Sequence, residues 1–527
     1  MFSKCDRLGF WKSCVTILMV GTACHRDILA QPEPLSDPLP NILLLYADDL
    51  GYGDVACYNP SRGLIPTPHI DRLAREGMRW TDAHASSAVC SPSRYTLLTG
   101  RYHWRTRLQS GIVGLWGKPV IAPHRRTLAS LAKSKNYRTQ CIGKWHLGWE
   151  WPIPEEHLTF MRHSHTKDVA LKAGHVRIWE EIFTQRIGSG PTERGFDHYF
   201  GTDVPNWPPY CFIENDHTLG IPTQWLEPLM LERNQASKQG PAIKGWQLEP
   251  ILPTLTAKCE AFLKDASSHE APFFLYVSLT APHTPLAVND AWKGKSHLGP
   301  YADLVMETDA AIGRILQALD DSGEAANTWV IFTSDNGCAP YVDVTSMESH
   351  GHHPSGPLRG YKSDAWEGGH RVPCIMRWPG VIPPSSISRS LVHQADLMAT
   401  TAEVLGIPLR ADEGVDSHSM LALMKGEGPS ARKHAVSCSI RGIPSIRDGK
   451  WKLILDAGSG GWSKGDSNHP VQLYNLENDL GEQHNLAPLF PDRVDHMSAM
   501  WEEVIDRGRS TPGVEQANDV EVDRHLR

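Results

Sequence analysis

The sequence predicts an α/β fold, with a large, mostly parallel sheet sandwiched by helices and a smaller C-terminal α+β subdomain with an antiparallel sheet. Three observations support this prediction. Four apolar, strand-like runs each stop at a polar or ionisable cluster, helical patterns lie between them, and short strands with tight turns replace this pattern near residue 430. With 527 residues, of which 40% are hydrophobic, the chain is long enough for a large core and more than one structural unit.

The four apolar runs have the composition of buried parallel strands. They are "NILLLYADD", "YRTQCIGKWHLG", "PFFLYVSLTAPHTP" and "TWVIFTSDNG". Ionisable or amide side chains end these runs: Asp48 and Asp49, Lys144 and His146, His283, and Asp335 and Asn336. Because ligands bind beyond the carboxyl ends of the strands in such sheets, we expect these clusters to meet in one crevice.

Helical patterns connect the strand-like runs. Thr67 as an N-cap and Pro68 in the first turn open one helix, which Gly77 ends. A second helix spans residues 301–319, and a third ends at Gly406. The second helix carries an apolar face: Leu304, Ile312, Ile315, Leu316 and Leu319.

The pattern changes after about Ser430. The segments "SIRDGKWKLILDAG" and "PVQLYNLENDLGEQHNLA" predict short antiparallel strands joined by tight turns. We therefore expect a main domain over residues 38–430 and a C-terminal subdomain over residues 431–515.

The N-terminus has the pattern of an export signal. Basic residues precede the apolar run "CVTILMVGTA", which is too short for a membrane span but suits a signal peptide. We expect residues 1–30 to hold this signal, with cleavage after Ala23 or Ala30, and the protein to be periplasmic or secreted without a membrane span. Lipid attachment at Cys24 is the alternative, against which Gly21 stands where lipoprotein signals usually carry leucine.

Composition argues against nucleic acid as a partner, because 52 basic residues face 60 acidic ones. The cysteines beyond the expected signal show neither zinc-site spacing nor the spacing of a small disulfide scaffold, which leaves room for one or two disulfides.

The two acidic motifs predict a metal site. Asp48, Asp49, Asp335 and Asn336 offer three carboxylates and an amide, which are hard oxygen ligands that suit Ca²⁺ or Mg²⁺ better than zinc. One Asp-Asp pair by itself is more often a turn or a helix cap. Two acidic motifs at separate strand ends favour a metal, because unpaired carboxylates crowded in a crevice would repel each other.

The cationic candidates complete the inventory of the crevice: Arg94, Lys144, His146, His283 and Lys362. Each by itself is more often a surface charge or a histidine with satisfied hydrogen bonds. Together with a metal ion they suit an anionic group such as sulfate or phosphate.

Several motifs carry a family resemblance. "CSPSRYTLLTG", which begins at Cys90, matches the sulfatase signature C-x-P-S-R-x-x-x-L-T-G without a mismatch. The other motifs also occur in the order of type I sulfatases: the Asp-Asp pair before this signature, and "GKWHLG", "APHTP", "SDNG" and "LRGYKSDAWEGGHRVP" after it. From about Asn41 to Leu486 the chain resembles a formylglycine-dependent sulfatase of the alkaline phosphatase superfamily, nearest to arylsulfatase A and N-acetylgalactosamine-6-sulfatase relatives. The resemblance implies an alkaline-phosphatase-like fold, sulfuric ester hydrolase activity, and residues 38–430 as the catalytic domain.

The resemblance also implies cofactors. Cys90 would be oxidised to formylglycine by a formylglycine-generating enzyme that recognises Pro92 and Arg94. An aldehyde hydrate has two hydroxyls, of which one attacks sulfur while deprotonation of the other expels sulfate; a serine sulfate would be about as hard to hydrolyse as the substrate. One Ca²⁺, preferred over Mg²⁺, would be held by the side chains Asp48, Asp49, Asp335, Asn336 and the modified residue 90.

The remaining roles follow from the same resemblance. Arg94 would orient the hydrate with Lys144 nearby, and His146 would be the base that drives sulfate elimination. His283 and Lys362 would contact the sulfate. One departure from the pattern is Asn136, which replaces the glycine that usually begins the second signature; after the helix "LASLAKSK" a left-handed residue is needed, and asparagine tolerates that conformation.

The expected substrate is a sulfated carbohydrate, 6-O-sulfated on galactose or N-acetylgalactosamine, because the resemblance points to the galactosamine-6-sulfatase branch. Candidate pocket segments are Thr202–Asp216 and the histidine-rich Ser349–Gly356. Two alternatives stay open: a phosphomonoester or phosphonate hydrolase on the same fold, and an unmodified, catalytically silent glycan-binding protein. The motifs lack the extra histidine ligands of a two-zinc phosphatase site, and a binding module would have no use for a formylglycine signature.

Overall fold

The computed structural model describes residues 39–163, 173–226, 238–465 and 469–524. The expected signal, residues 1–30, and Cys24 lie outside these ranges. Within the described ranges, none of the helices combines the length and the apolar character that crossing a membrane requires.

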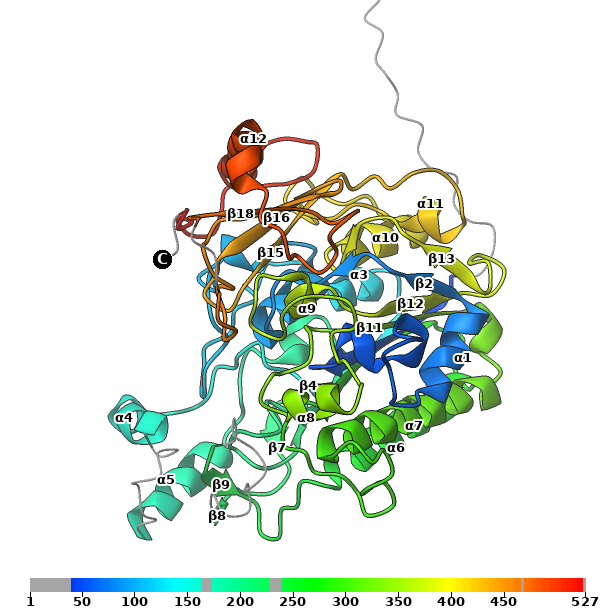
Figure 1. Cartoon of the computed structure of the whole chain (residues 1–527). Coiled ribbons are helices and arrows are strands. Elements are labelled where there is room, and N and C mark those ends of the chain that lie inside the picture. The colour runs from blue at the N-terminus through cyan, green and yellow to red at the C-terminus, as the bar shows by residue number, and fades with distance from the viewer. Residues whose placement is uncertain (1–38, 164–172, 227–237, 466–468, 525–527) are drawn as a thin grey trace, which may run out of the picture.

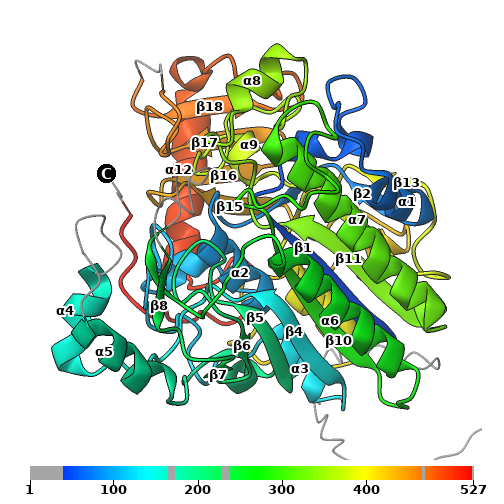
Figure 2. The same cartoon turned by 90° about the horizontal axis from the view of Figure 1, so that it is seen from below.

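A ten-stranded mixed sheet forms the centre of the molecule, in the order β13-β2-β12-β11-β1-β10-β4-β5-β6-β7 (Figures 1 and 2). Its middle strands all run parallel. They are β11 (Thr328–Ser334), β1 (Asn41–Asp48), β10 (Phe273–Pro282), β4 (Arg138–Lys144) and β5 (His198–Thr202). Four of these five strands are the predicted apolar runs, which confirms the core of the fold prediction.

The sheet is mostly parallel, as predicted, and its flanks add antiparallel strands that the sequence analysis did not identify. β12 (Cys374–Arg377) pairs antiparallel with β11 and with β2 (Met78–Trp80), while β13 (Ser386–Ser388) pairs parallel with β2. On the other edge, β6 (Ile213–Glu214) and β7 (His217–Thr218) continue antiparallel from β5. These strands are two to four residues long, too short to carry a readable periodicity.

Helices cover both faces of the sheet (Figure 2). One face packs on α1 (Pro68–Glu76), α6 (Ile251–Ala266) and α7 (Pro300–Asp321). The other packs on α2 (Cys90–Thr99), α3 (Leu128–Lys133) and α10 (Asp396–Val404). The predicted helices are therefore confirmed, and the five apolar side chains predicted for one face of α7 are all buried. After α3, Asn136 has a φ of +60°, the left-handed conformation expected there.

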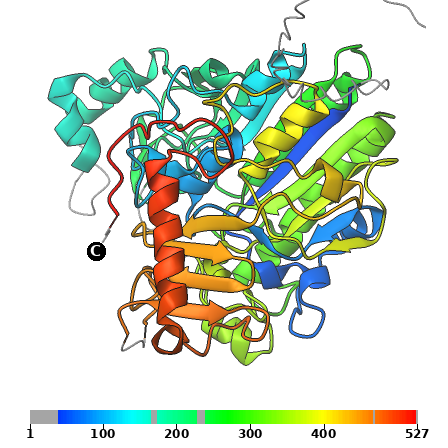
Figure 3. The same cartoon turned by 90° about the horizontal axis from the view of Figure 1, so that it is seen from above.

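A separate four-stranded antiparallel sheet lies in the C-terminal part of the chain, with α12 (Pro491–Asp506) across it (Figure 3). Its strands are β15 (His434–Cys438), β16 (Pro444–Asp448), β17 (Trp451–Ile454) and β18 (Gln472–Asn475). This confirms the predicted change of architecture. Tyr102 and Trp104 from the N-terminal half belong to the core of this sheet, so the domain boundary near residue 430 stays a prediction.

The remaining strands and α-helices of the described residues are β3 (Ala83–His84), α4 (Glu155–His163), α5 (Ala173–Phe183), β8 (Gln224–Leu226), β9 (Gly240–Ala242), α8 (Val344–Ser349), α9 (Glu367–His370), β14 (Val392–His393) and α11 (Leu421–Met424). The eight cysteines of the described residues are all free thiols.

Candidate active site

Cys90 is the first residue of α2, a helix whose ten residues are all buried. The preceding Val89 is extended, and no side chain caps the helix. Cys90 is 2% exposed and lines a cavity of about 340 Å³. Burial raises the pKa of its thiol to about 12, although Lys144 and Lys362 lower it. A thiol with this pKa is protonated at neutral pH, so the unmodified side chain is a poor nucleophile.

The acidic motifs meet because β1 and β11 are neighbours in the sheet, with Ala47 opposite Ser334. Asp49 has a φ of +62°, which turns the chain directly after β1. Its backbone N–H donates to Asp335 Oδ1 at 3.0 Å, and Asn336 Nδ2 donates to Asp49 Oδ1 at 2.8 Å. The three carboxylates and the amide that the sequence singled out therefore form one buried group.

Each carboxylate of this group has a buried cationic partner. The closest pairs are Lys144 Nζ with Asp48 Oδ2 at 2.8 Å, Lys362 Nζ with Asp49 Oδ2 at 2.7 Å, and Arg94 Nη2 with Asp335 Oδ2 at 2.7 Å. The predicted cations and the predicted metal ligands thus lie in direct contact. A charge pair this deeply buried is sensitive to the loss of either partner.

The pKa values of Asp335 and Asp48 are shifted in opposite directions. Burial and the neighbouring Asp48 raise the pKa of Asp335 to about 7. Burial by itself would raise the pKa of Asp48 as well, but Lys144 and other cations hold it well below its usual range. The protein's own cations therefore stabilise the ionised form of Asp335 less than that of Asp48. A divalent cation would favour the ionised form of Asp335.

The donor set fits a hard divalent cation. Asn336 Oδ1 is buried and has no hydrogen-bond partner, as expected of an oxygen reserved for a ligand. One ligand atom each from Asp48, Asp49, Cys90 and His283 lies within 4.8 Å of the others. Asp335 and Asn336, which hydrogen-bond to Asp49, add a carboxylate and an amide oxygen beside this group. Carboxylate and amide oxygens are the ligands that Ca²⁺ and Mg²⁺ prefer.

His146 and His283 both line the cavity beside Cys90. Burial and Lys144 hold the pKa of His146 well below its usual range, so its ring is neutral. Its Nε2 donates to the Val113 carbonyl at 3.0 Å, which leaves Nδ1 as an acceptor that has no partner. Burial lowers the pKa of His283 to about 4, and its Nε2 lies 3.5 Å from Asp49 Oδ2.

One of the two candidate pocket segments lines the cavity, and the other does not. Thr202–Asp216 contributes Val204, Asn206 and Trp207 to the cavity wall. The histidine-rich segment Ser349–Gly356 is not among the residues that line the cavity. Its His352 is buried and its Nε2 lies 2.9 Å from Asp54 Oδ1, so here the histidine has a structural hydrogen bond.

Sequence reasoning missed several residues at the site. Ser278 on β10 accepts from Arg94 Nη1 at 2.5 Å and donates to the Lys144 carbonyl at 2.6 Å, so it positions two predicted cations. A polar side chain inside the apolar run "PFFLYVSLTAP" was the available signal. Tyr341 and Trp462, which also line the cavity, lie in loops and carry no comparable signal.

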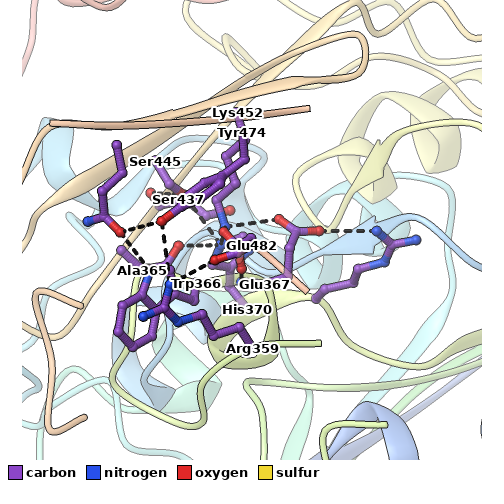
Figure 4. A network of polar contacts seen from close by, with 12 residues as sticks. Arg359, Ala365, Trp366, Glu367, His370, Ser437, Ser445, Lys452, Tyr474 and Glu482 are labelled. Atoms are coloured by element: carbon purple, nitrogen blue, oxygen red, sulfur yellow. Dashed lines mark hydrogen bonds and ion pairs between the residues drawn. The ribbon is translucent and has the colours of Figure 1, made fainter. Parts of the chain in front are cut away.

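A second buried ionic cluster lies between α9 and the C-terminal sheet (Figure 4). Lys452 Nζ, from β17, lies 3.0 Å from Glu367 Oε1, 2.9 Å from Glu482 Oε1 and 3.2 Å from His370 Nε2. Glu367 and His370 form the ends of α9, shortly after Lys362 in the chain. The Lys452 ammonium group therefore links the C-terminal sheet to α9, which follows Lys362 in the chain.

Comparison with known proteins agrees with this geometry. The family model described as Sulfatase matches residues 40–407. The N-acetylgalactosamine-6-O-sulfatase of Bacteroides thetaiotaomicron is 32% identical over 92% of this chain and 97% of its own length. Human arylsulfatase A is 31% identical over 85% of this chain and 83% of its own length. A solved structure from work on the metabolism of multiple glycosaminoglycans by Bacteroides thetaiotaomicron has a TM-score of 0.75 and 30% identity, and the match covers 89% of this chain and 99% of that one.

Proposed function

The chain belongs to the sulfatase family, and from that premise we propose that it uses a formylglycine derived from Cys90, and one Ca²⁺, to hydrolyse 6-O-sulfate esters of galactose or N-acetylgalactosamine in a sulfated polysaccharide. The observation that carries the proposal is the position of Cys90, buried at the floor of a cavity beside three carboxylates and their cations. The similarity to an N-acetylgalactosamine-6-O-sulfatase over 92% of the chain supports the substrate. Export and maturation by a formylglycine-generating enzyme are part of the same proposal.

Asp48, Asp49, Asp335, Asn336 and the modified residue 90 would hold the Ca²⁺. When bound, the ion would supply positive charge that stabilises negative charge on the sulfate and lowers the pKa of a nearby hydroxyl. The formylglycine hydrate would supply two hydroxyls on one carbon, one to accept the sulfate and one to release it.

The side chains of this chain would bind the anion and move the proton. Lys362 and His283 line the cavity with Cys90, and they would contact the sulfate oxygens. Arg94, held by Asp335 and Ser278, would orient the hydrate, with Lys144 nearby. His146 would accept the proton at Nδ1, because this atom is an acceptor without a partner on a neutral ring.

Paired rates on 4-nitrophenyl sulfate and 4-nitrophenyl phosphate test the reaction class. We expect the sulfate to turn over at least about 100-fold faster in kcat/KM, a difference of roughly 2.7 kcal/mol in transition-state stabilisation. The purified chain, produced together with a formylglycine-generating enzyme, is the material to measure. Faster turnover of the phosphate would replace the proposal with the phosphomonoester alternative.

Removal of the metal should have a separate, structural effect. Chelation should abolish activity and lower the melting temperature, because Asp48, Asp49 and Asp335 would lose a shared counter-charge. Added Ca²⁺ should restore both, and Mg²⁺ should restore less. A melting temperature that does not respond to either ion would contradict the assignment of these carboxylates as metal ligands.

A further inference from the structure

We propose that Trp462, from the C-terminal part of the chain, binds the sugar ring of the substrate by stacking its indole on the apolar face of the pyranose. The inference rests on the proposed function, because it takes a sugar sulfate as the substrate. It assigns a specificity role to residues 461–463, which follow β17 and lie far from the sulfatase motifs in sequence.

Trp462 differs from the other tryptophans in its exposure. At 48% exposed, it is the one tryptophan of the described residues that falls in the exposed class. It nevertheless lines the cavity whose floor holds Cys90, and its ring centroid lies 5.7 Å from that of Tyr341. A large aromatic surface left open to water beside a reactive group is available to a ligand at little conformational cost.

The loop that carries Trp462 is fixed by hydrogen bonds to the catalytic segment. The Trp462 backbone N–H donates to Ser363 Oγ at 2.8 Å. The next residue, Ser463, donates from its backbone N–H to Asp364 Oδ1 at 3.1 Å and from Oγ to Asp364 Oδ2 at 2.5 Å. Ser363 and Asp364 directly follow Lys362. The hydrogen bonds of these two residues therefore form one framework that positions the Trp462 indole relative to the Lys362 ammonium group.

The same framework reaches the nucleophile. The Ser363 backbone N–H donates to the carbonyl of Ala88, two residues before Cys90, at 2.8 Å. Ser363 adopts a φ of +84°, an unusual conformation for a residue with a side chain. A Cβ on Gly461 would lie 2.4 Å from the Ser363 carbonyl oxygen, so glycine is what permits this close approach. The position of Trp462 relative to Cys90 is therefore set before substrate arrives.

The cavity has a buried end and an exposed end, which suit different parts of the substrate. At its buried end, the floor, Cys90 is 2% and Lys362 4% exposed, and the ammonium group suits the anionic sulfate. The rest of the substrate must then lie toward the exposed end of the cavity, where Trp462 is. Asn206 and His146 also line the wall. Aromatic faces beside amide and imidazole groups match a pyranose, which has an apolar C–H face and a polar edge.

The test compares Trp462→Ala, Trp462→Phe and wild type on N-acetylgalactosamine-6-sulfate and galactose-6-sulfate. We expect Trp462→Ala to raise KM about tenfold with kcat within about twofold, because stacking on the ring is equal in the ground and transition states. Trp462→Phe, which keeps an aromatic face, should raise KM less than about threefold. Competitive inhibition by inorganic sulfate should be unchanged in both variants, because sulfate occupies the floor alone.

Phe490→Ala is the matched control. Phe490 is also aromatic, lies in the same C-terminal part and is 43% exposed, but it packs on Trp451 and does not line the cavity. Its KM should equal that of wild type. A wild-type KM in Trp462→Ala, or a loss of kcat with KM unchanged, would overturn the role of Trp462 and leave the proposed function standing. A wild type that hydrolyses 4-nitrophenyl sulfate but neither sugar sulfate would overturn the proposed substrate, and this inference with it.

Discussion

Cys90→Ala is expected to lower kcat on 4-nitrophenyl sulfate by at least about 10⁴-fold, because the variant lacks the atom from which the nucleophile is made. Its melting temperature should stay close to that of wild type. Within the described part of the chain the thiol has no hydrogen-bond partner, and alanine suits the first residue of α2. Turnover is measured with and without a co-expressed formylglycine-generating enzyme, and only the wild type should gain activity from it.

Cys90→Ser provides a sharper control, because serine keeps a hydroxyl but has no second hydroxyl to expel the sulfate. We expect at most a single turnover from this variant. Mass analysis of the wild-type tryptic peptide from Trp80 to Arg94 should show an aldehyde at position 90. A fully active wild type with an intact thiol, or full turnover by Cys90→Ala, would refute the proposed mechanism.

Lys452→Met is expected to destabilise the protein by about 3–5 kcal/mol, because it leaves buried carboxylates without their ammonium partner. Lys452 is fully buried, and its Nζ contacts both Glu367 and Glu482 (Figure 4). Glu367 keeps Arg371 at 3.1 Å and Arg447 at 3.5 Å as alternative partners, so the cost should fall mainly on Glu482. Chemical denaturation followed by intrinsic fluorescence measures this difference.

The double variant Lys452→Met, Glu482→Gln tests that division. Burial raises the pKa of Glu482 to about 7 even though Lys452 lowers it, so this carboxyl is the easier of the two to neutralise. Glutamine retains an acceptor for the Glu367 backbone N–H, which Glu482 Oε2 now accepts at 2.7 Å. The double variant should regain at least half of the lost stability. Equal stability of the single and double variants would show that the charge on Glu482 is not the source of the loss.

Much of the main sheet could be predicted from local sequence. A parallel strand buried on both faces must be apolar along its whole length, and β1 is buried at all eight positions. The ends of such strands are where polar side chains first become tolerable, so Asp48 and Asp335 marked both the strand ends and the site. The contact between these two motifs follows from the pairing of β1 with β11. We expected the motifs to meet because each follows an apolar, strand-like run of the same sheet.

The sequence by itself determined four of the five middle strands of the main sheet, four of the six helices that cover it and three of the four C-terminal strands, and it singled out the polar residues proposed for the site. Each of these depends on a periodicity or motif within a short stretch of chain. Only the tertiary structure decided the antiparallel flanks of the sheet, the pairing of each carboxylate with its cation, and the positions of Trp462 and Lys452. These features depend on contacts between residues distant in sequence, such as Lys452 with Glu367 and Trp462 with Ser363. No local pattern encodes such a partner, because the free energy of the contact appears only once the chain has brought both residues together.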